Sequence, residues 1–254
     1  MDYVEVIGSP GVGKSAIVDA LDQRWSRNAG WITDVRLLHG SPLVRRLASR
    51  IRRIRRFVRI FGLPPEPTQR WSEAAADFAR LNPELVSHIS EGMSSWATEL
   101  DKSSDQVQSQ WKSIHRSFAK VHLLWSRRPH ETVVLDGGIL KHASFVIEAC
   151  CEDTSAREAI RNEAMPRAYV LVDASAETIA HRVETGPKRI SGLQGRSAES
   201  LLQYCKVSSE DWRGKAETLR EAGLEVLSLC SEREPEVNAA ELERFLVDRR
   251  KHED

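Results

Sequence analysis

Short apolar runs, rich in β-branched residues, recur along the chain and are bounded by Gly, Pro, Asp or Ser. Several of these runs are apolar throughout rather than alternating, which is typical of strands buried on both faces of a parallel sheet. The five runs cover residues 3–7, 31–38, 132–135, 168–172 and 224–229. Helical patterns separate them, so the sequence predicts an α/β protein with a three-layer αβα fold and a five-stranded parallel sheet.

The segment between the second and third predicted strands is much longer than one crossover helix requires. Its apolar positions recur at three- and four-residue steps and predict helices over residues 42–61, 70–80, 83–101 and 104–127. Asn82 followed by Pro83 is typical of a helix start. We therefore divide the chain into a core of residues 1–40 and 130–254 and a helical insertion of residues 41–129.

The composition indicates a globular protein with balanced charge. Of 254 residues, 41% are hydrophobic and 29% charged, and 37 basic residues match 37 acidic ones, so no global charge favours nucleic acid or a membrane. No apolar stretch approaches the roughly 18 residues of a membrane helix, and the first is too short for a signal peptide. The cysteines, at 150, 151, 205 and 230, lack C-x-x-C spacing. We expect reduced thiols in a cytoplasmic protein.

The strongest motif follows the first predicted strand and precedes an amphipathic helix. Its members are Gly8, Ser9, Pro10, Gly11, Val12, Gly13, Lys14 and Ser15, and they match G-x-x-x-x-G-K-[ST] at every fixed position. In such a loop the backbone N–H groups and the helix N-terminus bind phosphates, Lys14 contacts the β- and γ-phosphates, and Ser15 ligates Mg²⁺. The sequence lacks an N-K-x-D guanine motif, which disfavours a GTPase, and the expected cofactors are ATP and Mg²⁺.

The third predicted strand ends in a carboxylate, Asp136, which is followed by Gly137 and Gly138. An apolar strand that delivers a carboxylate to the C-terminal edge of the sheet suits a residue near Mg²⁺ and the γ-phosphate. Asp136 is then either a Mg²⁺ ligand or the base that accepts the acceptor's proton. The other interpretation is a plain turn residue before two glycines.

These features resemble the nucleoside and nucleotide kinases of the P-loop class, especially thymidylate kinase and the deoxynucleoside kinases. The resemblance rests on the loop at 8–15, on Asp136, and on residues 169–182, where a predicted strand leads into a helix and a basic segment. It implies a lid whose cations close over the transferring phosphate, with Arg182, Lys188 and Arg189 as candidates and Arg196 as a weaker one. The family's arginine after the acidic residue is missing, since Gly137 stands there.

The predicted helix 42–61 is unusually basic. Eight arginines lie on it, namely Arg45, Arg46, Arg50, Arg52, Arg53, Arg55, Arg56 and Arg59. Either acidic residues elsewhere in the insertion neutralise them, or they form a surface for DNA, RNA or an anionic membrane. The candidates for binding an acceptor or polyanion are Arg45, Arg46, Arg52, Arg53 and Arg56, together with Arg36 at the end of the second predicted strand. The insertion's tryptophans, at 71, 96, 111 and 125, fit a core better than a base-stacking platform.

The sequence thus favours an ATP-dependent kinase that transfers the γ-phosphate to a hydroxyl or phosphate of a nucleoside- or nucleotide-type acceptor. The acceptor is expected between the loop, Asp136 and the helical insertion. A modified base within DNA is one variant, suggested by the arginines at 45–59. The alternative is a regulatory or nucleic-acid-stimulated ATPase without a covalent acceptor.

Overall fold

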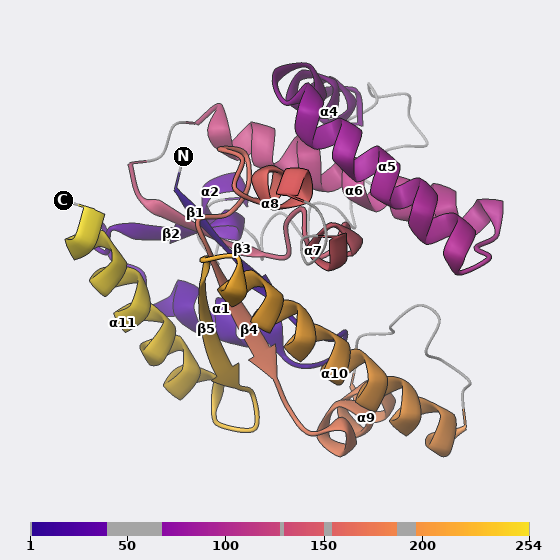
Figure 1. Ribbon diagram of the computed structural model, residues 1–254. Coiled ribbons are helices and arrows are strands. Elements are labelled where there is room, and N and C mark those ends of the chain that lie inside the picture. The colour runs from indigo at the N-terminus through magenta and orange to yellow at the C-terminus, as the bar shows by residue number, and fades with distance from the viewer. Residues whose placement is uncertain (1, 40–67, 128–129, 150–153, 187–196, 254) are drawn as a thin grey trace, which may run out of the picture.

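The computed structural model describes residues 2–39, 68–127, 130–149, 154–186 and 197–253 (Figure 1). Its centre is a five-stranded sheet in the order β2-β3-β1-β4-β5, and every neighbouring pair is parallel. The strands are β1 (Tyr3–Ile7), β2 (Trp31–Thr33), β3 (Thr132–Asp136), β4 (Ala168–Asp173) and β5 (Glu225–Cys230). The predicted α/β class and five-stranded parallel sheet are confirmed.

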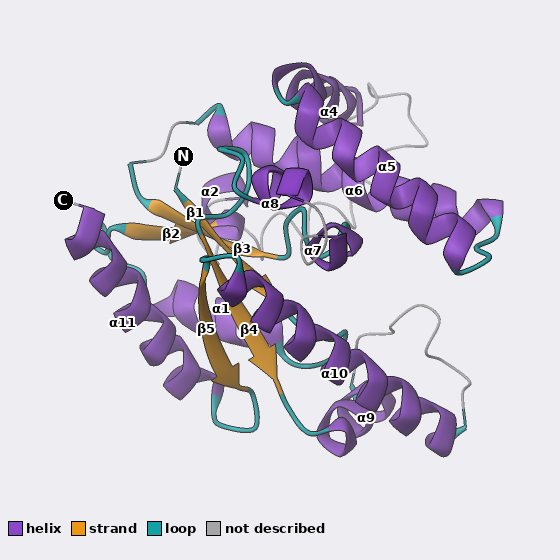
Figure 2. Ribbon diagram, in the orientation of Figure 1, coloured by secondary structure: helices purple, strands orange, loops and turns teal. Residues whose placement is uncertain are grey.

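The helices of the described ranges surround this sheet (Figure 2). They are α1 (Lys14–Arg24), α2 (Asp34–His39), α4 (Thr68–Leu81), α5 (Pro83–Glu99), α6 (Ser104–Trp125), α7 (Phe145–Ala149), α8 (Thr154–Ile160), α9 (Ala176–Thr185), α10 (Ala198–Glu221) and α11 (Pro235–Glu253). Within those ranges, none of them combines the length and the apolar composition that crossing a bilayer requires.

Each face of the sheet has its own hydrophobic cluster, which makes the molecule three-layered. Tyr3 and Ile7 of β1 belong to a cluster with α4, α5 and α6, whereas Val4 and Val6 belong to one with α1, α9 and α11. The side chains of a strand alternate between its faces, and both faces of β1 are buried, so its apolar run is nearly unbroken. Figure 1 shows α4, α5 and α6 on one side of the sheet and α11 on the other.

The strand expected over residues 31–38 is wrong beyond Thr33. Residues 34–39 form helix α2 instead. The reason is local: the Thr33 hydroxyl accepts a hydrogen bond at 3.1 Å from the N–H of Arg36, as a helix-capping side chain does. The apolar run alone did not distinguish a short strand with a following helix from a longer strand.

Three long helices occupy the described part of the segment between β2 and β3. Helices α4, α5 and α6 confirm the predictions at 70–80, 83–101 and 104–127 within a few residues, with Pro83 in the first turn of α5. Ser103 and Gln106 form a capping box at the start of α6. The four tryptophans of this region are partly buried against the hydrophobic cluster, as expected for core residues. The predicted helix 42–61 lies outside the described residues.

Candidate active site

The loop between β1 and α1 is shaped to bind an anion. Gly8 has φ 132°, and a Cβ there would lie 2.3 Å from the Val172 carbonyl oxygen of β4, so only glycine fits. Gly13 precedes α1 in a left-handed conformation and offers no capping side chain. Among the described residues, no group accepts a hydrogen bond from the N–H of Gly11, Gly13 or Ser15. Unpaired N–H groups at a helix N-terminus attract phosphates.

Lys14 lies within this loop and is almost completely buried, with 7% of its surface exposed. Its ammonium donates hydrogen bonds to the carbonyl oxygens of Gly8, at 2.6 Å, and Ser9, at 2.7 Å. The side chain therefore folds back over the first residues of its own loop. Its positive charge adds to the partial positive charge of the α1 N-terminus, which favours an anion at the same point.

Ser15 and Asp136 meet at the C-terminal edge of the sheet. The pairing of β1 with β3 aligns Val6 with Asp136. The Ser15 hydroxyl donates a hydrogen bond to Oδ2 of Asp136 at 2.6 Å. The other carboxylate oxygen, Oδ1, is buried and has no partner in the part of the chain that the structure describes. A hydroxyl and a carboxylate with an unused oxygen are ligands of the kind that Mg²⁺ takes, so the residues present fit this ion.

Arg182 of α9, which was expected in a lid, contacts the loop between β1 and α1. Its guanidinium donates hydrogen bonds to the carbonyl oxygen of Val12 at 2.8 Å and to the hydroxyl and carbonyl of Ser231 at 2.8 and 2.7 Å. Ser231 also donates to Val12 at 2.5 Å. In this conformation Arg182 fixes the loop backbone. The other lid candidates, Lys188, Arg189 and Arg196, lie outside the described residues.

Arg36 has an internal partner. It forms an ion pair with Asp22 at 2.9 Å, and its guanidinium lies 4.4 Å from the ring centroid of Trp25. Asp22 is buried, so this pair ties α2 to α1, and a role of Arg36 in acceptor binding stays a prediction. The remaining polyanion candidates, Arg45, Arg46, Arg52, Arg53 and Arg56, are outside the described ranges, and their prediction stays a prediction.

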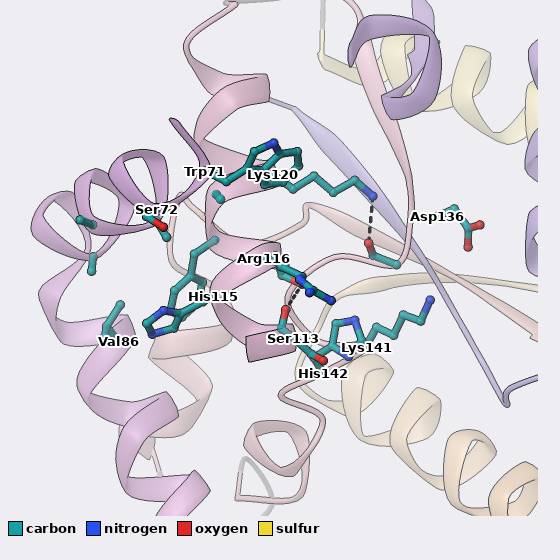
Figure 3. Close-up of a pocket in the computed structure, with 17 residues that line it drawn as sticks. Trp71, Ser72, Val86, Ser113, His115, Arg116, Lys120, Asp136, Lys141 and His142 are labelled. Carbon is teal, nitrogen blue, oxygen red and sulfur yellow. Dashed lines mark hydrogen bonds between the residues drawn. The ribbon is translucent and has the colours of Figure 1, made fainter. Parts of the chain in front are cut away.

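A cavity of about 1030 Å³ opens beside Asp136, between α4, α6 and the turn after β3 (Figure 3). Apolar side chains from α4 and α6, including Trp71, make up much of its wall. Its polar members are mostly cationic or imidazole groups and are listed here: His115, Arg116, Lys120, Lys141 and His142. Among the lining residues that the structure describes, Asp136 is the only acidic one. The cavity is thus an apolar space with a positively charged end near the carboxylate.

The turn after β3 is held by a buried carboxylate from the centre of the sheet. Glu5 of β1 has no exposed surface and accepts hydrogen bonds from the N–H groups of Gly138 and Lys141, both at 2.8 Å, and of Leu140, at 3.2 Å. Burial raises the pKa of Glu5, and the three N–H groups oppose that rise. The turn that follows Asp136 is therefore anchored to β1, the strand that precedes the loop at residues 8–15.

Two cavity cations have different surroundings. Lys120 donates to the Gly137 carbonyl oxygen at 3.1 Å and pairs with Asp34. Lys141 has no ion-pair partner among the described residues. Burial, together with the positive charges of Lys141, Lys120 and Arg116, lowers the pKa of His142 from 6.5 to about 4. The charged end of the cavity accordingly has an excess of positive charge.

Sequence reasoning missed the cationic residues of the cavity. Lys141 and His142 lie five and six positions after Asp136, and Arg116 and Lys120 are one helical turn apart on α6. That spacing was the available signal, but it indicates a shared face without showing that the face meets the turn after β3.

Comparison with known proteins adds no family assignment. No protein-family model matches the sequence, and no curated protein is significantly similar to it. The loop at residues 8–15, Asp136 and the cavity beside it are therefore the features that bear on function.

Proposed function

We propose that this protein is an ATP-dependent phosphotransferase with a P-loop NTPase fold. The triphosphate of ATP binds to the loop at residues 8–15, and an acceptor binds in the cavity beside Asp136. The sheet order supports this arrangement, because β1 has β3 on one side and β4 on the other. Ligands of open α/β sheets bind at the carboxyl ends of the strands where the order reverses.

The observation that carries the proposal is the 2.6 Å hydrogen bond between Ser15 and Asp136. It joins the last residue of the phosphate-binding motif to the carboxylate at the end of β3. Mg²⁺ would be held by these two residues and would neutralise charge on the β- and γ-phosphates. The N–H groups of Gly11, Gly13 and Ser15 orient the phosphates, and the Lys14 ammonium exchanges its contacts with loop carbonyls for phosphate oxygens.

In the proposed transfer, an oxygen of the acceptor forms a bond to the γ-phosphorus while the bond to the β–γ bridging oxygen breaks. ADP leaves with that bridging oxygen. If the acceptor is a hydroxyl, its proton passes to Asp136 or to water that contacts Asp136. A phosphate acceptor needs no such base, and Asp136 then acts through Mg²⁺ alone. The acceptor belongs to the nucleoside and nucleotide class by resemblance, with a modified base in DNA as a further substrate to test.

The test is transfer of label from [γ-³²P]ATP in the presence of Mg²⁺. The acceptor panel contains nucleosides, nucleoside monophosphates, other small phosphates and alcohols, and DNA or RNA with hydroxymethylated bases. We expect a labelled product that Lys14→Ala and Asp136→Asn abolish. Lys206→Ala, an exposed lysine of α10, is the matched control and retains activity.

Two outcomes would contradict the proposal. Label released only as inorganic phosphate across the whole panel would favour the ATPase alternative, and stimulation of that release by DNA at low salt would identify its nucleic-acid-dependent form. Failure of the wild-type protein to bind Mg·ATP would remove the proposal altogether.

A further inference from the structure

The cavity beside Asp136 has positive charges that no described residue balances. Arg116 and Lys141 both line it, and neither has an ion-pair partner in the described ranges. Lys120 is the third cation of the lining, and its partner is Asp34. The single carboxylate of the lining, Asp136, already accepts a hydrogen bond from Ser15. A site with this imbalance favours a ligand that brings negative charge.

The position of Lys141 is set by the structure around it. Its backbone N–H is fixed by Glu5 at 2.8 Å. Its side chain lies across Gly137, because a Cβ at that residue would be 2.2 Å from Cδ of Lys141 and 2.8 Å from its ammonium nitrogen. Gly137 follows Asp136 directly, and Figure 3 shows the charged end of Lys141 on the side of the cavity where Asp136 lies. Only glycine at position 137 leaves this path open.

The rest of the cavity suits a flat apolar group. Its apolar lining comes from α4 and α6 and consists of Trp71, Ala75, Ala76, Ala79, Phe118 and Ala119. The α4 wall is therefore mainly apolar, with the Ser72 hydroxyl and the Trp71 indole N–H as its hydrogen-bonding groups. The volume of about 1030 Å³ is that of a site for one small organic molecule.

We propose that this cavity binds a small organic anion, with its apolar ring between α4 and α6 and its phosphate or carboxylate on Lys141 and Arg116. The ligand is the phosphoryl acceptor if the proposed function holds, since the charged end of the site lies at Asp136. The binding itself does not depend on ATP. A free small molecule places one terminal anionic group at the charged end of the cavity. A base within a polynucleotide carries its charge on the backbone phosphates instead, so it fits this charge arrangement less well.

His142 provides a reporter of the bound charge. It lines the same cavity, and Lys141, Lys120 and Arg116 are the charged groups that depress its pKa in addition to burial. An anion on Lys141 and Arg116 offsets their field and raises the pKa of His142. A neutral ligand of the same shape does not offset the field of the cations, and the burial it adds does not raise the pKa of His142.

The experiment compares ligands that share one ring system. The probes are 1-naphthyl phosphate, 1-naphthoate and neutral 1-naphthol, each titrated calorimetrically into the full-length wild-type protein without ATP. We expect one of the two anions to bind at least about 10-fold more tightly than 1-naphthol, because hydrogen bonds to charged groups are worth one to two powers of ten. The ratio between the two anions decides whether the site prefers a phosphate or a carboxylate.

Variants identify the residues that bind the anion. Lys141→Gln and Arg116→Gln are each expected to weaken binding of the preferred anion by about 10- to 100-fold and to leave 1-naphthol unchanged. Lys112→Gln, an exposed lysine on α6 that contacts Gln108, removes the same charge away from the cavity and serves as the control. Urea unfolding confirms that each variant is folded. An NMR titration of the histidines, with His142 assigned by its loss in His142→Gln, is expected to show its pKa rising only with the anions.

Three results overturn the inference: neither anion binds, 1-naphthol binds as tightly as both anions, or Lys141→Gln binds the preferred anion like the wild type. The failure of the proposed function gives a different pattern. Anion binding with the expected variant effects, but without phosphoryl transfer from ATP, leaves the site intact and removes its role as an acceptor site. ATP-dependent transfer to a neutral acceptor would support the proposed function and would overturn the inference that the cavity binds an anionic ligand.

Discussion

The buried carboxylate of Glu5 should be essential for the turn that carries Gly137 and Lys141. It accepts three backbone hydrogen bonds from residues that lie more than 130 positions later in the chain. Glu5→Gln tests this role with little change of shape. The glutamine oxygen can still accept from Gly138 and Lys141, but its NH₂ group then faces the N–H of Leu140.

The expected loss of stability follows from that one mismatch. A buried donor left without an acceptor costs about 1–3 kcal/mol, so Glu5→Gln should lower the free energy of unfolding by about that amount in the pH range where Glu5 is ionised. Glu5→Ala leaves all three N–H groups without the carboxylate and should cost at least about 3 kcal/mol. Because the turn carries Lys141, binding of the anionic probe should weaken in Glu5→Gln, whereas binding of Mg·ATP at the loop should change little.

The pH dependence of this loss has a defined sign. Burial raises the pKa of Glu5 above its ordinary value of 4.5 in the folded protein, so the folded state holds the proton more tightly than the unfolded chain. The contribution of this group to stability is therefore complete below pH 4.5 and decreases as the pH rises through the raised pKa. The stability advantage of the wild type over Glu5→Gln should shrink as the pH rises from about 4.5.

Urea unfolding followed by tryptophan fluorescence, from pH 4.5 to pH 8, measures both quantities. The account predicts a difference that is largest at the acid end, together with weaker anion binding in the variant. Equal stability of wild type and Glu5→Gln at every pH would refute the proposed anchoring of the turn, and so would an advantage that grows with pH.

Three further predictions concern neighbouring residues. Gly137→Ala should displace the side chain of Lys141 and weaken binding of the preferred anionic probe about 10-fold by calorimetry. Gly214→Ala, in α10, where an added Cβ would meet no atom outside the neighbouring helix backbone within 4 Å, should bind the probe like the wild type. Equal binding by both variants would contradict the packing of Lys141 over Gly137. The pKa of His142 is lowered from 6.5 to about 4, so its contribution to stability is present above pH 6.5 and is lost as the pH falls, by up to about 3 kcal/mol. His142→Gln should therefore lose less stability than the wild type between pH 7 and pH 4.5 in urea unfolding. An equal loss in both proteins would contradict the assignment of this loss to His142. Arg182→Ala should weaken Mg·ATP binding about 10-fold, since the loop carbonyl of Val12 loses a charged donor; unchanged affinity would mean that the loop keeps its shape without this support.

The sequence predicted most of the sheet because buried parallel strands leave a local signature. The runs at 3–7, 132–135, 168–172 and 224–229 agree with β1, β3, β4 and β5 to within one residue at either end. The run at 31–38 misled because the Thr33 cap, which starts α2, depends on a side-chain hydrogen bond rather than on hydrophobicity. The loop at residues 8–15 was recognisable because it is a contiguous motif after a strand, and Asp136 because it ends an apolar strand; their functional roles stay predictions.

The cavity was not predictable in the same way. Its charge depends on how α6 lies against the turn after β3, and a helical pattern fixes which residues share a face but not what that face meets. The position of Lys141 depends on Glu5, which looks in the sequence like a single polar residue in an apolar strand. The sequence placed Arg36 at the end of a strand but could not show its ion pair with Asp22, and its role in acceptor binding stays a prediction.

The most direct test of the account is calorimetric binding of a non-hydrolysable Mg·ATP analogue to the wild type, Lys14→Ala and Lys206→Ala. The account predicts that the wild type and Lys206→Ala bind alike and that Lys14→Ala loses at least about 10-fold in affinity, because a charged donor to phosphate is removed. Equal affinity in all three proteins would contradict the claim that residues 8–15 hold the triphosphate.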